Sequence, residues 1–226
     1  MNKPFIFINS AMTVDGKIST IERRQVRISS PKDMELVDEL RAGSDAVLVG
    51  MKTLLTDDPK LTVKSDKLRG ERLGKGLSEN PMKVVVGRLD FVNLDSEFIN
   101  YGNAVKVFFA SRDSDSLKID EIGSMARVYV SADNDINPSF IAETLYGLGV
   151  RKLMIEGGAD TNYRFLRAGL VDEIYVTVAP RIFGGKNAPT LVDGDGFSED
   201  KALKLKLLSI DRISDELLLK YSVLYG

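Results

Sequence analysis

Short apolar runs of strand length alternate with helical patterns along most of this chain, and this alternation constrains its fold more than any other feature. Helical patterns cover Pro31–Leu40, with Ser30 as the predicted N-cap, and Pro138–Leu148. Several runs are apolar on both faces, which is typical of a parallel sheet that helices cover on both sides. The pattern therefore predicts an α/β fold. The apolar runs are Phe5–Ile8, Ala46–Val49, Val84–Val86, Val105–Ala110, Val128–Val130, Lys152–Ile155 and Glu173–Val178.

The C-terminal part of the chain has the pattern of a β-hairpin. Leucine and lysine alternate within Ala202–Ile210, and a second strand pattern covers Glu216–Tyr225 after a turn at 211–214. Neither an internal repeat nor a linker divides the sequence, so we expect a single domain over residues 1–226. The charged, glycine-dotted stretch Ser65–Glu79 predicts an irregular surface segment, which is either a solvated loop or a mobile lid beside a substrate.

The composition excludes several kinds of site. Because the chain has no histidine and no cysteine, it cannot form a disulfide, a histidine-based hydrolase triad or a zinc site with histidine or cysteine ligands, and we expect no metal site. The net charge of −2 argues against nonspecific nucleic-acid binding. No apolar run approaches the roughly 20 residues of a membrane span. We therefore expect a cytoplasmic protein without nucleic-acid or membrane partners.

Small residues follow the predicted strands at the positions where a parallel sheet binds ligands. Gly50, Gly87, Ser111 and Gly157 each come directly after an apolar run. Because the carboxyl ends of parallel strands line a ligand site, this convergence predicts a nucleotide site. The Glu-Gly-Gly motif at 156–158 also opens into a helical pattern, whose first N–H groups suit a phosphate. An ordinary tight strand–helix turn is the alternative.

Four motifs that occur in one order resemble the riboflavin-biosynthesis reductases, a family whose fold is similar to dihydrofolate reductase. They are Thr-x-x-x-Asp-Asp-Pro at 53–59, Glu-Gly-Gly at 156–158, Leu-Val-Asp-Glu at 170–173 and Ala-Pro-Arg-Ile-Phe-Gly-Gly-Lys at 179–186. The resemblance begins at 8–17 and continues to at least 194–197. It implies a dihydrofolate reductase-like three-layer α/β fold, in which a mainly parallel central sheet has helices on both faces and an antiparallel C-terminal hairpin.

The resemblance also implies an activity. An enzyme of this family is an NADPH-dependent oxidoreductase that reduces the ribosylamino group of a diaminopyrimidinone 5′-phosphate to ribitylamino. No deaminase motif fits the chain, which starts at the first reductase strand, so we expect the stand-alone archaeal and fungal arrangement. A homodimer is expected from the resemblance alone. Two alternatives stay open, namely a dihydrofolate reductase and a noncatalytic nucleotide-binding protein.

The resemblance assigns particular residues to the cofactor. The family usually has a glycine at position 159 and an aspartate at position 87, where this chain has Ala159 and Gly87, so we expect backbone contacts at these two positions. A 2′-phosphate needs a cation, and either Arg88 or Arg112 follows a strand closely enough to supply it, unless both are solvated loop residues. The other cofactor contacts implied are Thr53, Asp57, Gly157, Gly158, Asp160 and Thr161.

The same resemblance assigns residues to the substrate and to proton transfer. Lys64 stands where the family more often has arginine, and a lysine keeps the charge that a phosphate needs. Without histidine, proton transfer falls to a carboxyl group, and Glu156 and Asp57 are the two candidates. The substrate contacts implied are Lys17, Gln25, Arg41, Leu61, Lys64 and Glu156.

Overall fold

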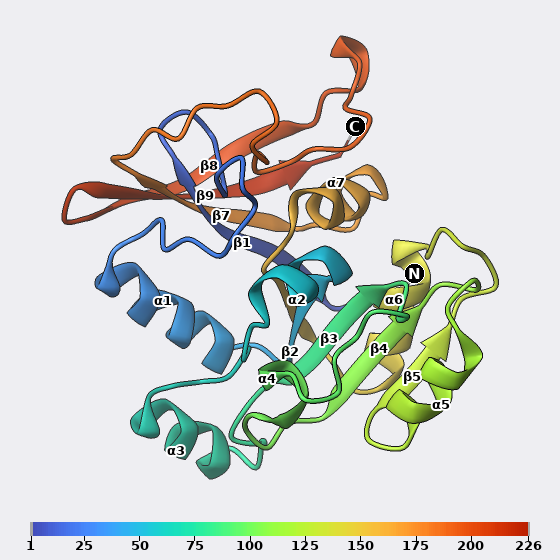
Figure 1. Cartoon of the computed structure of the whole chain (residues 1–226). Coiled ribbons are helices and arrows are strands. Elements are labelled where there is room, and N and C mark those ends of the chain that lie inside the picture. The colour runs from blue at the N-terminus through green and yellow to red at the C-terminus, as the bar shows by residue number, and fades with distance from the viewer. Residues whose placement is uncertain (1, 226) are drawn as a thin grey trace. The chain divides into compact units, whose positions relative to one another are not determined.

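The computed structural model describes residues 2–225, which form two units, and one of the boundaries between them falls within helix α1 (Pro31–Ala42). Unit 1 contains residues 2–4 and 38–154, and unit 2 contains residues 5–37 and 155–225. Figure 1 labels most of the elements of both units. The predicted single domain stays a prediction. In residues 2–225, no helix has the length and apolar character that crossing a bilayer requires.

Unit 1 is built on a parallel sheet, as the apolar runs predicted. The ladders β2–β3, β3–β4 and β4–β5 are all parallel (Figure 1). Every residue of β2 is buried, which explains why its sequence is apolar on both faces. The strand order is β5 (Arg127–Val130), β4 (Lys106–Ala110), β3 (Met82–Gly87), β2 (Ala46–Gly50) and β6 (Lys152–Ile155).

Helices cover both faces of this sheet. Phe108 and Phe109 are neighbours on β4, so their side chains point to opposite faces. Phe108 packs edge-on against Phe98 of α4 (Glu97–Asn100), with 5.6 Å between ring centroids. Phe109 packs against Phe140 of α6 (Pro138–Gly147) at 5.7 Å. Two adjacent aromatic residues therefore hold one helix on each side. The remaining helices of unit 1 are α2 (Met51–Asp57), α3 (Asp66–Gly74) and α5 (Ser116–Gly123).

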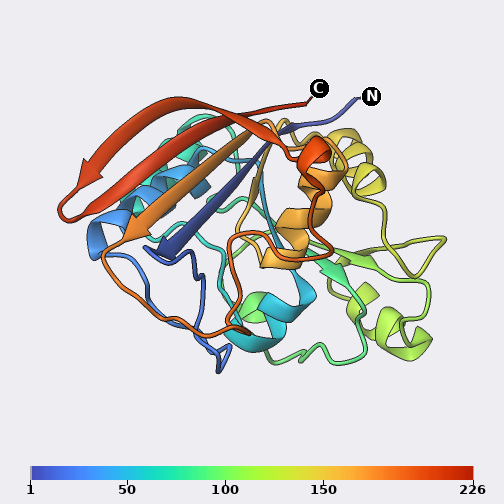
Figure 2. The same ribbon diagram turned by 90° about the horizontal axis from the view of Figure 1, so that it is seen from above.

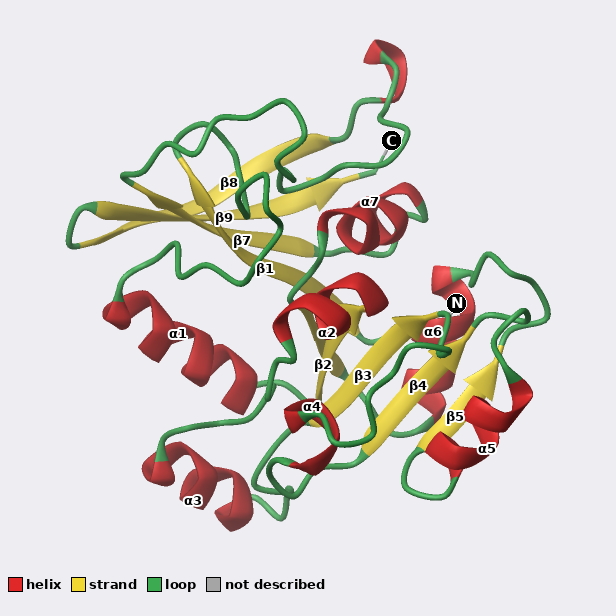
Figure 3. Cartoon of the chain, viewed as in Figure 1, coloured by secondary structure: helices red, strands yellow, loops and turns green. Residues whose placement is uncertain are grey.

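The prediction of an irregular segment over Ser65–Glu79 is wrong, because α3 forms there (Figure 3). The Ser65 side chain caps the helix by accepting from the backbone N–H of Leu68. Arg72 is buried and donates to the carbonyl oxygens of Ala42 at 2.7 Å and Ser44 at 2.8 Å. These carbonyls lie about thirty residues earlier in the chain. The glycines and charges of the segment favoured a loop in the sequence, but the hydrogen bonds from Arg72 to Ala42 and Ser44 stabilise a helix there.

Unit 2 contains the predicted C-terminal hairpin. Strand β1 pairs in parallel with β7, and β9 pairs antiparallel with both β7 and β8 (Figure 2). Ser214 turns the hairpin with a left-handed backbone (φ 59°). The buried Glu216 accepts from the N–H and the hydroxyl of Ser30, the residue before α1. The elements are β1 (Phe5–Thr13), α7 (Ala159–Arg167), β7 (Glu173–Ala179), the 3₁₀ turn η1 (Glu199–Lys201), β8 (Lys204–Ile213) and β9 (Glu216–Leu224).

Candidate active site

In unit 1 the carboxyl ends of adjacent strands lie side by side. The register aligns Gly50 with Val86 and Gly87 with Ala110, so the residues that follow β2, β3 and β4 share one edge of the sheet. Helix α2 starts directly after Gly50 and contains both Thr53 and Asp57. Because these two residues are four apart, they lie on one face of α2. Gly87 therefore lies at the sheet edge where a nucleotide site was predicted, and Thr53 and Asp57 lie on the helix that starts at this edge.

The packing of α2 explains the glycine at position 87. Gly87 has a positive φ of 144°, and a β-carbon there would lie 2.5 Å from the β-carbon of Met51. A side chain would therefore push α2 away from the end of β3. The requirement for glycine comes from the fold itself, and a ligand is not needed to account for it.

The two candidate arginines have different surroundings. Arg88 pairs with Asp90 at 2.5 Å and with Asp113 at 3.5 Å. The Arg88 guanidinium holds the pKa of the Asp90 carboxyl below its usual value. Arg112 is exposed, and its side chain makes no ion pair or hydrogen bond with the described residues. Because two carboxylates already neutralise Arg88, Arg112 is the stronger candidate for an anion.

Asp57 and Asp58 end α2 in different ways. Asp57 is half-buried, and burial raises the pKa of its carboxyl despite a hydrogen bond from Thr56. Asp58 adopts a left-handed conformation (φ 40°), and its carboxylate accepts from the backbone N–H groups of Glu97 at 2.8 Å and Phe98 at 3.0 Å. Asp58 thus fixes the end of α2 against α4 and leaves the neighbouring Asp57 as the carboxyl with a perturbed pKa.

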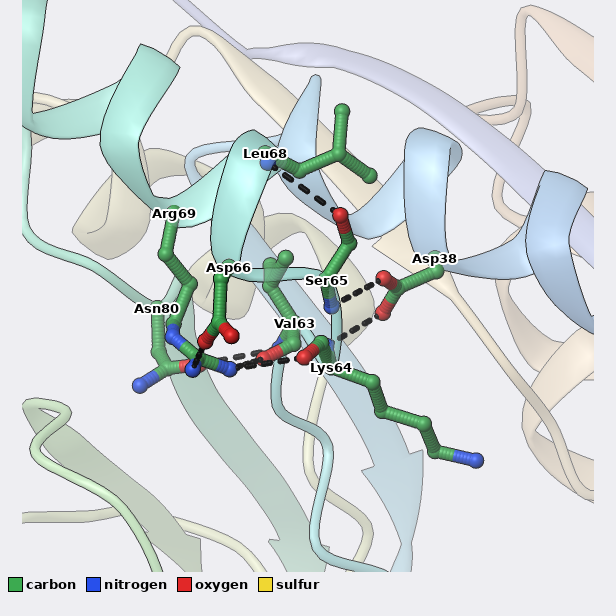
Figure 4. Close-up of polar contacts among 8 residues, drawn as sticks. All are labelled: Asp38, Val63, Lys64, Ser65, Asp66, Leu68, Arg69 and Asn80. Carbon is green, nitrogen blue, oxygen red and sulfur yellow. Dashed lines mark hydrogen bonds and ion pairs between the residues drawn. The ribbon is translucent and has the colours of Figure 1, made fainter.

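Three predicted substrate residues of unit 1 lie close together. Arg41 donates from Nη1 to the carbonyl oxygen of Thr62 at 3.2 Å, which ties the end of α1 to the segment after α2. In that segment Leu61 is fully buried and left-handed (φ 47°). Lys64 is exposed, and its side chain extends away from its neighbours (Figure 4). The segment therefore offers one cation beside Arg41.

In unit 2 the Glu-Gly-Gly motif leads directly into α7. Gly157 has a φ of 104°, which favours glycine, and the Gly157–Gly158 peptide is cis. Gly158 is the N-cap of α7 and accepts from the N–H of Asn162 at 3.0 Å. Ala159, Asp160 and Thr161 form the first turn of α7, and the half-buried Glu156 precedes the glycines. A helix thus opens directly after the two glycines, as the sequence predicted.

Asn162 is a feature of this turn that the sequence analysis missed. It has no exposed surface, and its amide nitrogen donates to the carbonyl of Leu191 at 2.9 Å. Its amide oxygen is buried without a partner among the described residues. A buried polar atom left unpaired costs about 1–3 kcal/mol, so this position is unusual. Neither the spacing nor the neighbours of Asn162 indicate this in the sequence.

The other two predicted substrate residues of unit 2 belong to the segment after β1. Lys17 donates from Nζ to the carbonyl oxygen of Ala188 at 3.0 Å. Asp15 accepts from the N–H groups of Phe183 and Gly184, and a bond from Thr13 is the largest cause that lowers its pKa. Gln25 is exposed. Lys17 is therefore bound to the segment that follows the second Gly-Gly pair of the sequence, at 184–185.

The RibD C-terminal domain model matches residues 4–219. The chain belongs to this family. Two curated relatives are archaeal proteins named 2,5-diamino-6-ribosylamino-4(3H)-pyrimidinone 5′-phosphate reductase. The protein from Archaeoglobus fulgidus is 39% identical over 94% of this chain and 95% of its own length. The protein from Methanothermobacter thermautotrophicus is 36% identical over 98% of this chain and 99% of its own length. The family predicted from the four motifs is confirmed.

Solved structures with low sequence identity share the fold of this chain. Acinetobacter baumannii RibD matches with a TM-score of 0.81 at 20% identity, covering 100% of this chain and 59% of RibD. Dihydrofolate reductase from Enterococcus faecalis matches with a TM-score of 0.50 at 12% identity, covering 97% of this chain and 96% of that enzyme. The predicted dihydrofolate reductase-like α/β fold is therefore confirmed.

In residues 2–225 no acidic cluster has the geometry of a metal site.

Proposed function

We propose that this member of the RibD C-terminal domain family reduces 2,5-diamino-6-ribosylamino-4(3H)-pyrimidinone 5′-phosphate with NADPH. The observation that carries the proposal is the 39% identity to a reductase of that name over 94% of this chain. The motif at 156–158 forms the strand–helix turn before α7, and the motif at 53–59 covers most of α2, the helix that follows Gly50; this proposal assigns cofactor contacts to both motifs. The reaction adds a hydride to C1′ of the sugar and a proton to the substrate, and the ring-opened imine becomes a ribitylamino group.

The proposed cofactor residues have the chemistry that a dinucleotide needs. Bound NADPH supplies the hydride, so the protein has to bind and orient it. Apart from its two chain neighbours, no described residue has a heavy atom within 4 Å of the place where a β-carbon on Gly157 would be, so there is space beside this backbone. The first turn of α7 offers backbone N–H groups to a phosphate. Arg112 is our choice for the 2′-phosphate because its charge is not neutralised by another described residue.

Asp57 is our choice for the residue that handles the proton. A general acid works best when its pKa lies near the working pH, and burial raises the pKa of Asp57 toward that range. The neighbouring Asp58 accepts two hydrogen bonds from the backbone of α4, and these bonds hold the end of α2, which contains Asp57, in place. Glu156, which precedes the glycines, remains the second candidate.

We infer that the protein works as a homodimer of single-domain chains in the cytoplasm. Strand β8 is the outermost strand of the unit 2 sheet and is exposed along almost its whole length. An exposed apolar strand is a liability for a monomer, and a second copy of the same surface would cover it. We assign no nucleic-acid or membrane partner because the net charge is −2 and the described helices are short. The exposed apolar residues of the hairpin are Leu205, Leu207, Leu208, Ile210, Leu217 and Leu224.

The test is NADPH oxidation by the purified protein with two substrates in parallel. We expect turnover with the ribosylaminopyrimidinone phosphate and none with dihydrofolate. Turnover of dihydrofolate would make the protein a dihydrofolate reductase instead. NADPH binding without turnover of either substrate would support a noncatalytic nucleotide-binding protein. Light scattering of the same sample should give twice the mass of 24.9 kDa.

A further inference from the structure

The backbone of the segment 62–65 is bound by side chains instead of by another strand. Residues 58–65 form neither helix nor strand. Within this stretch, Val63 donates its N–H to Asn80 Oδ1 at 2.9 Å, and Lys64 and Ser65 donate theirs to the two carboxylate oxygens of Asp38 at 2.6 and 2.8 Å (Figure 4). Three successive backbone donors therefore end on two side chains from elsewhere in unit 1.

The carbonyl groups of the same segment are also bound by side chains. Arg69 donates to the carbonyl oxygens of Val63 at 3.0 Å and Lys64 at 2.8 Å, and Arg41 donates to that of Thr62. These six bonds fix the backbone of the segment without the help of a sheet. Among residues 62–65, Lys64 is the one that is exposed to solvent, and its side chain takes no part in these bonds.

Asp38 is the central acceptor of this network. It lies on α1, is only 6% exposed and binds two consecutive N–H groups with one carboxylate. Bonds to an ionised carboxylate are roughly twice as strong as neutral ones, and burying such a charge is costly unless it is bound in this way. The Lys64 side chain points away from Asp38, and its Nζ makes no bond or ion pair with the described residues (Figure 4).

We propose that Asp38 is a positioning residue for the substrate: by fixing the backbone of Lys64, it presents Nζ to the 5′-phosphate. This inference rests on the proposed function, which assigns Lys64 to the phosphate. A lysine is a flexible point charge, so its affinity for a phosphate depends on how much freedom it loses on binding. A rigid backbone under Lys64 lowers that loss. Asp38 therefore acts through Lys64 and does not itself touch the substrate.

The first experiment measures the KM for the phosphorylated substrate. Lys64→Ala should raise this KM by about 10- to 100-fold, because it removes a charged contact. Asp38→Asn keeps the shape of the side chain but loses one acceptor, and it should raise the KM by about 3- to 10-fold with kcat and the KM for NADPH unchanged. The matched control is Asp33→Asn, an equally buried carboxylate of α1 that binds Thr177 instead. The control should leave the KM unchanged.

A double-mutant cycle separates positioning from a general structural effect. In the Lys64→Ala background, Asp38→Asn should cause no further rise in KM, because the residue through which it acts is gone. An equal rise in both backgrounds would overturn the proposal. If Asp38→Asn does not fold, Arg69→Met removes two bonds to the same segment from a partly exposed position and takes its place in the cycle.

Amide hydrogen exchange distinguishes failure of this inference from failure of the proposed function. Without any substrate, Asp38→Asn should speed exchange of the Lys64 and Ser65 amides, while amides of β3 stay protected. Unchanged exchange would overturn the positioning role even if the enzyme is the proposed reductase. Faster exchange together with an unchanged KM in Lys64→Ala would overturn the assignment of Lys64 to the phosphate, and the proposal with it.

Discussion

Lys83 offers a quantitative test of the structure, because it is a lysine with no exposed surface on strand β3. Its Nζ donates to the carbonyl oxygens of Phe98 at 2.8 Å and Tyr101 at 2.6 Å, around the end of α4. Burial, helped by the charge of Lys106, lowers the pKa of Lys83 from 10.5 to about 8. The two carbonyl acceptors can bind the neutral amine as well as the ammonium.

The lowered pKa makes stability depend on pH in a defined window. Below pH 8 the lysine is protonated in both the folded and the unfolded chain, so it contributes no slope. Between about pH 8 and 10.5 the unfolded chain keeps a proton that the folded chain has lost, and the free energy of unfolding rises with pH. Each pH unit well inside this window adds about 1.4 kcal/mol, which gives a gain of about 2 kcal/mol between pH 7 and pH 9.5.

The perturbation is Lys83→Met, which keeps most of the side-chain volume and removes the titrating group. Urea unfolding of both proteins at pH 7 and pH 9.5 gives the free-energy difference between them at each pH. Other titrating groups affect both proteins equally, so they cancel. We expect the stability of the wild type relative to Lys83→Met to increase by about 2 kcal/mol at the higher pH. A difference that does not change with pH would refute the assignment of a buried, readily deprotonated lysine.

Three further predictions concern the proposed site. Gly158 has a φ of −73° that any residue can adopt, so Gly158→Val should keep the far-ultraviolet circular dichroism of the wild type but lose NADPH binding; unchanged affinity would make the turn purely structural. Arg112→Ala should lower kcat/KM for NADPH by about 10- to 100-fold and have little effect on kcat/KM for NADH. Arg88→Ala should lower kcat/KM for NADPH less, because Arg88 is already paired with two carboxylates. Equal use of NADPH and NADH by the wild type would contradict the assignment of either arginine to the 2′-phosphate. Because the acid form of Asp57 persists to a raised pKa, kcat should fall as pH rises through that pKa, and Asp57→Asn should lower kcat and abolish this limb of the pH profile. If the limb survives in Asp57→Asn and disappears in Glu156→Gln, the proton handler is Glu156.

The sequence by itself determined the strands, the hairpin and the family. These features depend on neighbouring residues, whose periodicity records which faces are buried. Phe108 and Phe109 are apolar in succession because each supports a helix on its own side of β4. The alternation of Leu205 and Leu207 with lysines also indicated the antiparallel hairpin, although both leucines are exposed in β8.

Only the tertiary structure decided which charged side chains are already bound within the protein. Arg88 and Arg112 look alike in sequence, but Asp113, twenty-five residues after Arg88, helps to neutralise only Arg88. The helix α3 depends on Arg72, whose carbonyl partners lie about thirty residues away. Asp38 reaches Lys64 across twenty-six residues in the same way. Burying a polar or charged group costs free energy unless a hydrogen-bond or ion-pair partner offsets it, and the fold supplies these partners from distant parts of the chain. The local periodicity of the sequence does not show which residues those partners are.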